Sequence, residues 1–476
     1  MTKQESVDLN IKDLSFINDI NSLAVIGPSR KRDYYFLRTH AENYKGKIYA
    51  VHPKIKEISG FANENIYPSL MDIPESVDYV YITVSSSQIL NVIDDCVEKG
   101  VKLAGVFTAG FSDLGTEEGR KLEEEMIRRA KNSLRIIGPN GMGMTYPKKG
   151  IGWRMKFPSE PGNIAFIGQS GGISNLIVYK GSPMGIKFSK VFSFGNGNDV
   201  DFVDLLYFLS NDEETDVILC YLEGIKEGRG EELIKVLKQN KKPIVVLKAG
   251  KFKGAAIAAN THTAAITGEY RVWKTIFDKY NVIDADSVEQ LLYAAKLIDA
   301  YGLFELKNIA VLSISGGYGV VLVDQIENMG LEVPPFSPEI QNQLNQELIA
   351  VGTSAKNPLD IAAQFRNLKL VKHIVELVLS DKNIDGLIMD LPSYYLNTGY
   401  QPGRTPIMER KLIEIMSLGY SYKKPIIPII QRTNSPEHRS SMIEKLNEKK
   451  IPVFNQPLEF LSLLPKISKC AKNKME

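Results

Sequence analysis

Residues 163–172 read Asn-Ile-Ala-Phe-Ile-Gly-Gln-Ser-Gly-Gly, a short apolar run that ends in a serine-glycine turn. The apolar run predicts a buried strand, and the glycines predict a tight turn into a helix. The same order returns at residues 308–319, where Asn-Ile-Ala-Val-Leu-Ser precedes Ile-Ser-Gly-Gly-Tyr-Gly. The repetition indicates two copies of one flavodoxin-like unit, in which parallel strands alternate with helices.

Similar apolar runs recur along the chain and alternate with amphipathic stretches, a pattern typical of parallel sheets covered on both faces. We expect strands at residues 22–26, 47–51, 79–84, 103–107, 135–137, 163–167, 187–193, 216–221, 244–247, 308–313, 386–390 and 425–430. This predicts an α/β protein with a Rossmann-like N-terminal domain followed by two flavodoxin-like parallel-sheet domains. The expected domains are residues 1–146, 147–298 and 299–476.

The composition is that of an ordinary globular protein. Of 476 residues, 43% are hydrophobic and 24% are charged, so several cores can form. A net charge of +2 gives no reason to expect nucleic acid or a membrane surface as a partner. Residues 1–13 lack the apolar core of a signal peptide, and no apolar run reaches membrane-spanning length. We therefore expect a soluble cytoplasmic protein.

One histidine lies in an unusually small environment. Residues 260–268 read Asn-Thr-His-Thr-Ala-Ala-Ile-Thr-Gly, which leaves the imidazole of His262 accessible, and Gly250, Gly254 and Gly268 supply flexible backbone around it. A side chain that is attacked by two substrates in turn needs such a segment. His262 is therefore a candidate phosphoryl carrier; the alternative is a histidine at a helix start with Thr261 as N-cap.

The two serine-glycine turns are candidate anion sites. Glycines at a strand-to-helix turn let backbone amides approach an anion, and the helix N-terminus adds partial positive charge. We expect phosphate contacts from Gln169, Ser170, Gly171 and Gly172, and from Ser315, Gly316 and Gly317. The alternative is that these glycines only provide the backbone geometry of a tight turn.

Several further motifs point to a family. The run Thr261–Gly268 and the run Tyr221-Leu222-Glu223-Gly224 are similar to the histidine motif and the strand-end glutamate motif of the ADP-forming acyl-CoA synthetases, relatives of succinyl-CoA synthetase. Over nearly its whole length the chain resembles their α subunit. Other matching segments are Gly138-Pro139-Asn140, Ala109-Gly110-Phe111, Gly115–Gly119, Gln169-Ser170-Gly171, Gly195-Asn196 and Asn357-Pro358-Leu359-Asp360.

The resemblance implies an acid-thiol ligase. A CoA-binding domain and two flavodoxin-like domains would act on CoA and a small carboxylic acid, while a separate ATP-grasp β subunit would hold Mg-ADP or Mg-ATP in a hetero-oligomer. No ATP-grasp segment is recognisable in this chain. His262 would carry the phosphoryl group, and Glu223 would accept a hydrogen bond from its other ring nitrogen. The alternative for Glu223 is an ion pair with Lys226 or Lys248.

The first domain is expected to bind CoA at the ends of its strands. The expected contacts come from Gly27, Ser29, Arg30, Arg32, His52, Pro53, Val84, Ser85 and Asn140. The loop after Gly27 is shorter than is usual in the family and lacks a later glycine, so Arg30, Lys31 and Arg32 would bind the diphosphate through side chains. The alternative is that this basic run is a solvated face. Ala264 also replaces a glycine of the family motif.

Two other function classes remain for comparison. One is a non-catalytic CoA-binding protein of the same architecture with a regulatory or scaffolding role. The other, a nicotinamide dehydrogenase, is disfavoured because Gly27 lacks the G-x-G-x-x-G continuation. No metal site is expected, since His40, His52, His373 and His438 have no metal-ligand spacing, and the three cysteines are far apart.

Overall fold

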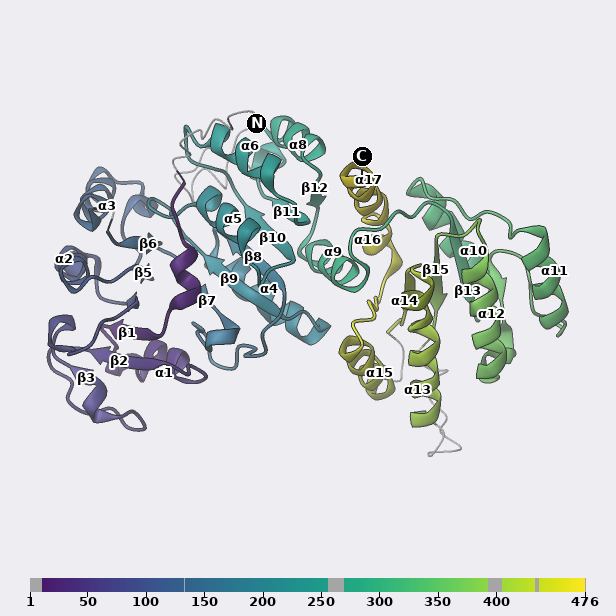
Figure 1. Ribbon diagram of the computed structural model, residues 1–476, viewed down its shortest axis with the longest axis horizontal. Helices are drawn as coiled ribbons and strands as arrows, with labels where there is room; N and C mark the ends of the chain where they lie inside the picture. Colours follow the sequence, from purple (N-terminus) through teal and green to yellow (C-terminus); the bar gives the residue numbers. More distant parts are fainter. Residues whose placement is uncertain (1–10, 132, 256–268, 393–404, 433–435, 476) are drawn as a thin grey trace, which may run out of the picture. The chain divides into compact units, whose positions relative to one another are not determined.

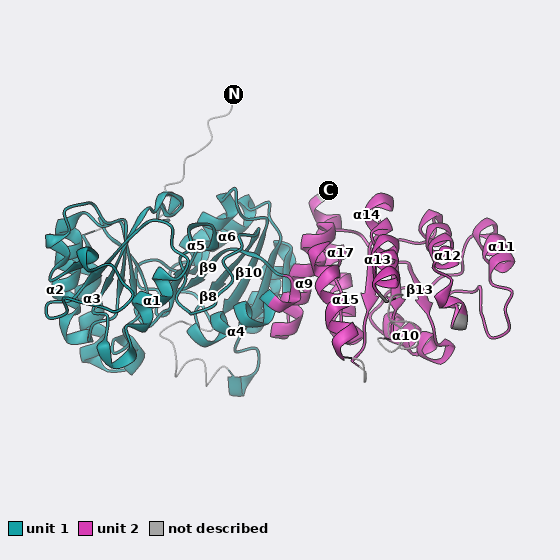
Figure 2. Cartoon of the chain, turned by 90° about the horizontal axis from the view of Figure 1, so that it is seen from below, with its two compact units in different colours: residues 1–182, 186–284 teal, residues 183–185, 285–476 magenta. Residues whose placement is uncertain are grey.

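The computed structural model describes residues 11–131, 133–255, 269–392, 405–432 and 436–475 (Figure 1). The chain forms two compact units (Figure 2). The first contains residues 1–182 and 186–284, and the second contains residues 183–185 and 285–476. Two sheets belong to the first unit, and a third sheet belongs to the second.

The first sheet has six parallel strands in the order β3-β2-β1-β4-β5-β6. This is the strand order of a Rossmann fold, in which the order reverses between β1 and β4. The strands are β1 (Ser22–Ile26), β2 (Lys47–Val51), β3 (Ile66–Tyr67), β4 (Tyr79–Ile82), β5 (Leu103–Val106) and β6 (Arg135–Ile137), and the helices are α1 (Tyr35–Ala41), α2 (Ile89–Lys99) and α3 (Glu117–Ala130).

Helices α2 and α3 lie side by side along the first sheet (Figure 1). Ile93 of α2 and Met126 of α3 are fully buried and belong to the same core as Val80 of β4. Local signals fix where these helices begin and end. Thr116 accepts a hydrogen bond from the amide of Gly119 at the start of α3, and Gly100 ends α2 with a positive φ of 75°.

The second sheet has the order β12-β11-β10-β8-β9-β7. Strands β8 to β11 run parallel, whereas β7 pairs antiparallel with β9. The strands are β7 (Gly143–Thr145), β8 (Ile164–Gly168), β9 (Phe188–Ser193), β10 (Val217–Leu222), β11 (Ile244–Lys248) and β12 (Val282–Ala285), and the helices are α4 (Gly171–Gly181), α5 (Phe202–Asn211), α6 (Gly230–Gln239) and α8 (Tyr270–Lys279).

The third sheet has four parallel strands in the order β14-β13-β15-β16. Its strands are β13 (Ile309–Ser313), β14 (Leu359–Asp360), β15 (Gly386–Asp390) and β16 (Ile426–Ile429). The helices of this unit are α9 (Val288–Tyr301), α10 (Gly316–Asn328), α11 (Pro338–Glu347), α12 (Leu368–Ser380), α13 (Thr405–Met416), α14 (Leu418–Tyr422), α15 (Pro436–Glu448), α16 (Pro457–Leu461) and α17 (Leu464–Met475).

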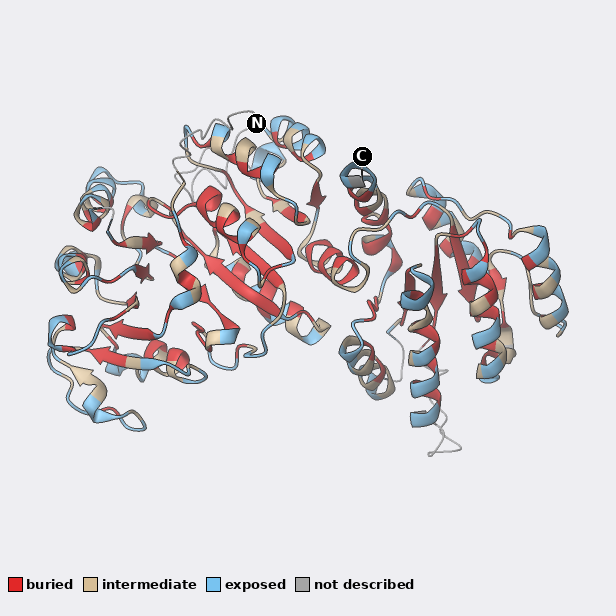
Figure 3. Ribbon diagram, in the orientation of Figure 1, coloured by how far each residue is buried: buried red, intermediate tan, exposed pale blue. Residues whose placement is uncertain are grey.

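The central strands of the sheets are buried and most of the surrounding helices expose one side (Figure 3). The α/β class with a Rossmann-like sheet and two flavodoxin-like sheets, predicted from the sequence, is confirmed. The second and third sheets share the flavodoxin order, because the first parallel strand of each, β8 and β13, lies between the next two strands of the chain. Within the described part of the chain, no helix is both long and apolar enough to cross a membrane.

Candidate active site

The carboxyl ends of β8 and β10 meet where the strand order of the second sheet reverses. In open α/β sheets, ligands bind at this position because the loops leave the sheet in opposite directions there. Gln169 follows β8 directly, and Glu223 follows β10 directly. The structure therefore brings together Gln169 and Glu223, two candidate site residues that lie 54 positions apart in the sequence.

Gln169 joins these two strand ends. Its Oε1 accepts hydrogen bonds from the main-chain amides of Glu223 at 2.6 Å and Gly224 at 3.2 Å. The side chain is buried, so these bonds also satisfy a polar group that burial would otherwise penalise. The oxygen of Gln169 thus holds the glutamate loop in place, and only its amide nitrogen remains for the phosphate contact expected from the sequence.

Glu223 has one satisfied and one unsatisfied carboxylate oxygen. Oε1 accepts a hydrogen bond from the hydroxyl of Tyr221 at 3.2 Å. Oε2 is buried and has no hydrogen-bond partner among the described residues. Burial and the neighbouring Glu223 raise the pKa of Tyr221, so this phenol stays a donor.

The ion pair considered for Glu223 is not present among the described residues. Lys248 instead donates to the main-chain carbonyl oxygens of Glu223 at 2.6 Å and Ala249 at 2.5 Å. Burial lowers the pKa of Lys248 to about 8, although the negative charge of Glu223 acts in the opposite direction. Lys248 therefore supports the loop backbone and leaves Oε2 available.

Helix α4 begins at this same edge of the sheet. Ser170 is its N-cap, and the hydroxyl oxygen accepts a hydrogen bond from the amide of Ile173 at 3.3 Å. Gly171 and Gly172 form the first turn. A Cβ at Gly172 would meet only the Ser170 hydroxyl, at 3.7 Å, so the backbone there has open space in front of it. The turn offers amide groups and the positive end of the helix.

His262 lies outside the described residues, and its role stays a prediction. The described chain stops at residue 255 and resumes at residue 269. The flanking elements are β11, which pairs with β10, and α8, which begins at Tyr270. The described residues 249–255 therefore leave the sheet at the end of β11, next to β10, the strand that Glu223 follows.

The first sheet has its own point of reversal, between β1 and β4. Gly27 has a φ of 78°, a conformation that favours glycine, and a Cβ there would lie 2.6 Å from Cγ1 of Val84. The structure therefore places Gly27 and Val84, two of the expected CoA contacts, against each other. Ser29 and Ser85 are exposed on the same two loops.

The basic run forms a 3-10 turn over Arg30–Arg32. All three basic side chains are exposed, and none has an ion-pair partner among the described residues. Asp33 and Tyr34 follow in the left-handed region, with φ of 46° and 53°, before α1 begins. The turn thus presents three exposed positive charges shortly after Gly27.

The remaining expected CoA contacts lie at the same edge, because all strands of the first sheet are parallel. His52 and Pro53 follow β2, and Nδ1 of His52 accepts a hydrogen bond from the amide of Lys54 at 3.1 Å. Burial, followed by the charge of Lys54, lowers the pKa of His52. Asn140 follows β6 and is exposed. Its main-chain N–H donates a hydrogen bond to the main-chain carbonyl of Thr108 at 2.9 Å.

The second serine-glycine turn belongs to the second unit. Ser315 is the N-cap of α10, and its hydroxyl accepts a hydrogen bond from the amide of Tyr318 at 3.5 Å. A Cβ at Gly316 would lie 2.6 Å from Oδ2 of Asp360, so a carboxylate of the chain already faces this turn.

Sequence reasoning missed a buried carboxylate near this turn, Asp390 at the end of β15. Its oxygens accept hydrogen bonds from the hydroxyl of Ser313 and the amide nitrogen of Gln431, both at 3.1 Å. Burial raises the pKa of Asp390 to about 6. The only sequence signal is an acidic residue at the end of an otherwise apolar strand.

Comparison with known proteins agrees with this arrangement. Residues 21–147 match the family described as CoA binding domain, and residues 161–298 match the family described as succinyl-CoA ligase like flavodoxin domain. The α subunit of acetate–CoA ligase (ADP-forming) II from Pyrococcus furiosus is 31% identical over 97% of this chain and 98% of its own length. Acetate–CoA ligase (ADP-forming) I from Archaeoglobus fulgidus is 34% identical over 76% of this chain and 52% of that protein.

A solved structure extends the similarity to three dimensions. The dinucleotide forming acetyl-coenzyme A synthetase 1 of Ca. Korarchaeum cryptofilum, in complex with phosphate and ADP, has a TM-score of 0.83 and 29% identity. The alignment covers 97% of this chain and 98% of that one. The fold and these matches define an acid-thiol ligase with a CoA-binding domain. Within that class, the chain belongs to the ADP-forming acyl-CoA synthetase family and corresponds to the α subunit.

Proposed function

We propose that this chain is the α subunit of an ADP-forming acyl-CoA synthetase that works with a separate ATP-grasp β subunit. The complex would interconvert acyl-CoA, ADP and phosphate with carboxylic acid, CoA and ATP. The observation that carries the proposal is Glu223, a buried carboxylate with one oxygen unsatisfied, held beside the N-terminus of α4.

The proposed reaction has three steps. A phosphate oxygen attacks the acyl carbon of acyl-CoA, the C–S bond breaks, and CoA leaves with its sulfur protonated. A nitrogen of His262 then attacks the phosphorus of the acyl phosphate, and the carboxylate leaves. Finally a terminal oxygen of ADP attacks the phosphohistidine, which gives ATP and restores the imidazole. Histidine suits this relay because the neutral ring is nucleophilic near neutral pH.

Glu223 would orient the histidine. A buried carboxylate oxygen without a donor is unfavourable, so a donor from the approaching segment would stabilise it. The ring N–H of His262 opposite the reacting nitrogen would supply this bond and fix the tautomer, and the carboxylate would stabilise the positive ring during transfer. Strand β11, the last described strand before His262, pairs with β10, the strand that Glu223 follows, and this supports the pairing.

The amides at the start of α4 would hold the phosphoryl oxygens. Gly172 leaves open space at the first turn, whereas Gly171 packs against Met142, and Ser170 keeps the helix end formed. The turn of Ser315, Gly316 and Gly317 is the corresponding candidate in the second unit.

CoA would bind along the carboxyl edge of the first sheet. Gly27 and Val84 form the floor at the strand reversal, and Arg30 and Arg32 would contact the diphosphate. Ser29, His52, Pro53, Ser85 and Asn140 line the same edge. Mg-ADP or Mg-ATP would bind to the partner. A non-catalytic scaffolding role is not favoured, since the relatives matched over nearly the whole chain are named as ligase subunits.

Labelling tests the phosphoryl relay. The chain is incubated with acetyl-CoA and radiolabelled phosphate, and we expect acid-labile, base-stable label on the peptide that contains His262. The His262→Ala variant should take up none, while His373→Ala, which removes an exposed histidine of α12, should label normally. Label retained on that peptide in His262→Ala would exclude the assignment.

Adding the partner tests the division of labour. The phosphorylated chain alone should not convert ADP to ATP, and a purified ATP-grasp partner should restore the conversion. Turnover of nucleotide by the chain alone, absent in His262→Ala, would refute a separate nucleotide site.

Calorimetric titration of the full chain with CoA tests the first sheet. Charge-assisted contacts contribute about 1.5 to 3 kcal/mol, so Arg30→Ala and Arg32→Ala should each weaken binding about ten-fold or more. Arg120→Ala, which removes an exposed arginine paired with Glu117 on α3, should bind as wild type. Unchanged affinity in both variants would mean that the basic turn is only a solvated face.

A further inference from the structure

A cavity adjoins the candidate active site at the carboxyl end of β10. It is lined in part by Gln169, Asn196, Asn198, Asp201, Gly224 and Lys226. The main-chain amide of Gly224 donates a hydrogen bond to the side chain of Gln169, so the cavity and the candidate active site have these two residues in common. Its volume of about 40 Å³ is too small for CoA and suits a group of a few oxygen atoms.

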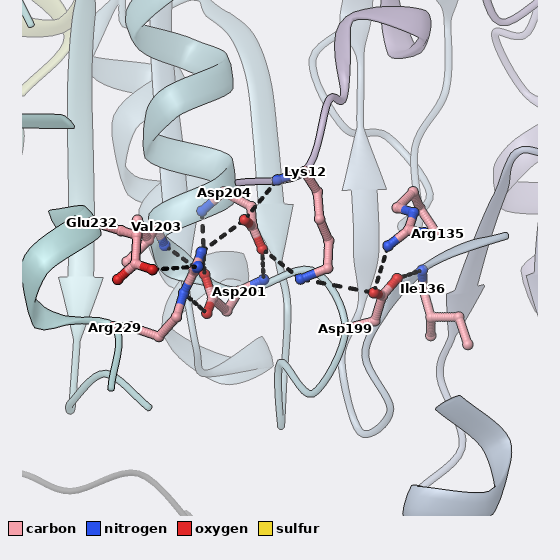
Figure 4. A network of polar contacts seen from close by, with 9 residues as sticks. All are labelled: Lys12, Arg135, Ile136, Asp199, Asp201, Val203, Asp204, Arg229 and Glu232. Atoms are coloured by element: carbon pink, nitrogen blue, oxygen red, sulfur yellow. Dashed lines mark hydrogen bonds and ion pairs between the residues drawn. The ribbon is translucent and has the colours of Figure 1, made fainter. Parts of the chain in front are cut away.

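The buried arginines and aspartates near this cavity are already paired (Figure 4). The ion pairs are Arg229 with Asp201 at 2.8 Å and with Asp204 at 2.8 Å, Lys12 with Asp204 at 3.3 Å, and Arg135 with Asp199 at 2.9 Å. Each of the three buried aspartates therefore has a cationic partner within the network.

Lys226 is the exception. It lines the cavity, yet its ammonium has no hydrogen bond or ion pair with the residues that the structure describes. Glu123 is a further buried carboxylate close by, and it is held by neutral donors instead: the amide of Ser112 at 2.9 Å and the side-chain nitrogens of Asn196 and Asn198.

The electrostatics agree with an unpaired cation. Burial lowers the pKa of Lys226 to about 8, and the nearby Lys12 acts in the same direction. Asp201, Glu123 and Asp199 act against this shift without overcoming it. A half-buried ammonium without a contacting counter-ion is unfavourable, and an anion in the cavity would stabilise it.

We infer that Lys226 binds an oxyanion of the substrate, a carboxylate or a phosphoryl group, in the cavity beside Glu223. The inference rests on the proposed function and adds the residue that holds the charged substrate. Lysine binds such groups as a point charge, and it would do so where the phosphoryl group leaves the acyl phosphate as a carboxylate forms.

Binding to the purified full chain tests this directly. Inorganic phosphate and acetate are titrated separately, with affinity measured by calorimetry at pH 7. Loss of one charge-assisted contact should weaken binding of at least one anion about ten-fold to a hundred-fold in Lys226→Met. Lys238→Met, which removes an exposed lysine on α6, should leave both affinities unchanged.

Two further readouts separate binding from a structural role. A lysine needed for folding would lower the melting temperature when replaced, whereas Lys226→Met should keep or raise it, because it removes an unpaired buried charge. At pH 8 the wild type should take up protons on binding the anion, as its amine becomes charged, and Lys226→Met should not.

The outcomes assign the ligand. Weakened phosphate binding alone identifies the phosphoryl group, and weakened acetate binding alone identifies the carboxylate. No binding of either anion by the wild type, or equal affinities in wild type and Lys226→Met, would overturn the inference. Failure of turnover with the partner subunit, with anion binding through Lys226 intact, would contradict the proposed function and not this site.

Discussion

The second and third sheets carry the same strand-turn-helix motif, but the carboxylates beside the two motifs differ in their hydrogen bonds. Beside α4, Glu223 keeps one buried oxygen without a donor. Near α10, both oxygens of Asp390 accept hydrogen bonds, from Ser313 and Gln431, and the first turn of the helix already faces the carboxylate of Asp360.

The difference separates geometry from chemistry. Both turns satisfy the requirements of a helix N-terminus, so a serine-glycine signal in a sequence identifies the turn and not its use. A buried carboxylate with an oxygen that accepts no hydrogen bond requires another donor. A carboxylate whose oxygens both accept hydrogen bonds from its own domain contributes to the structure of that domain. The serine-glycine turn at the start of α4 is therefore the better candidate for the phosphoryl relay.

The largest expected effect is on Glu223. Glu223→Gln should reduce phosphorylation of the chain about 10- to 100-fold, because it removes the charge that orients and stabilises the reacting ring. Asp390→Asn is the matched substitution in the third sheet and should change the rate less than three-fold, a rough bound for a residue outside the relay. Rates are measured by labelling under single-turnover conditions.

An equal reduction of the phosphorylation rate in Glu223→Gln and Asp390→Asn would contradict the different roles assigned to the two turns. Loss of CoA affinity in Glu223→Gln would instead indicate misfolding, so the same preparations are titrated with CoA.

An intermediate effect is expected on the pH dependence of the second unit. The pKa of Asp390 is raised from 3.8 to about 6, so between those values the folded chain holds a proton that the unfolded chain has lost. Its stabilising effect is complete below about pH 4 and is lost as the pH rises through about 6, a difference of about 3 kcal/mol. Asp390→Asn should flatten this dependence, as measured by hydrogen exchange of β13 and β15 between pH 4 and 7. An unchanged profile would show that Asp390 titrates normally.

The smallest effect concerns the caps themselves. Ser170→Ala and Ser315→Ala each remove an N-cap hydrogen bond and should destabilise the helix start by about 1 kcal/mol. Hydrogen exchange in the first turns of α4 and α10 measures it. We expect similar local losses, with a reduction in phosphorylation only for Ser170→Ala. A reduction in both variants would bring the second turn into the relay.

The long, apolar elements were predictable from the sequence. The bounds of β1, β2, β6 and β15 agree with the expected runs, because apolar residues make up most of each run. The two-residue strands β3 and β14 and the glycine-containing β7 were missed, because pairing with neighbours, rather than composition, makes them strands.

The site was predictable only where chemistry follows from a motif. Glu223 and Gln169 were found, but their contact depends on the strand order, which no local pattern contains. Lys226 was considered only as a partner for Glu223. Its isolation follows from the pairing of Arg229, Lys12 and Arg135 with three aspartates, and this charge balance exists only after folding.

Strand β7 has a practical consequence for anyone who divides this protein. It precedes residue 147, yet it forms the edge of the second sheet by pairing with β9. A cut after Tyr146 would leave β7 on the N-terminal fragment, although it pairs with β9 of the other fragment. The backbone of β9 would then be exposed, and an exposed strand edge promotes aggregation. A cut between β6 and β7, before Gly143, would leave both sheets with their own strands, and the two fragments made this way should be the more soluble pair.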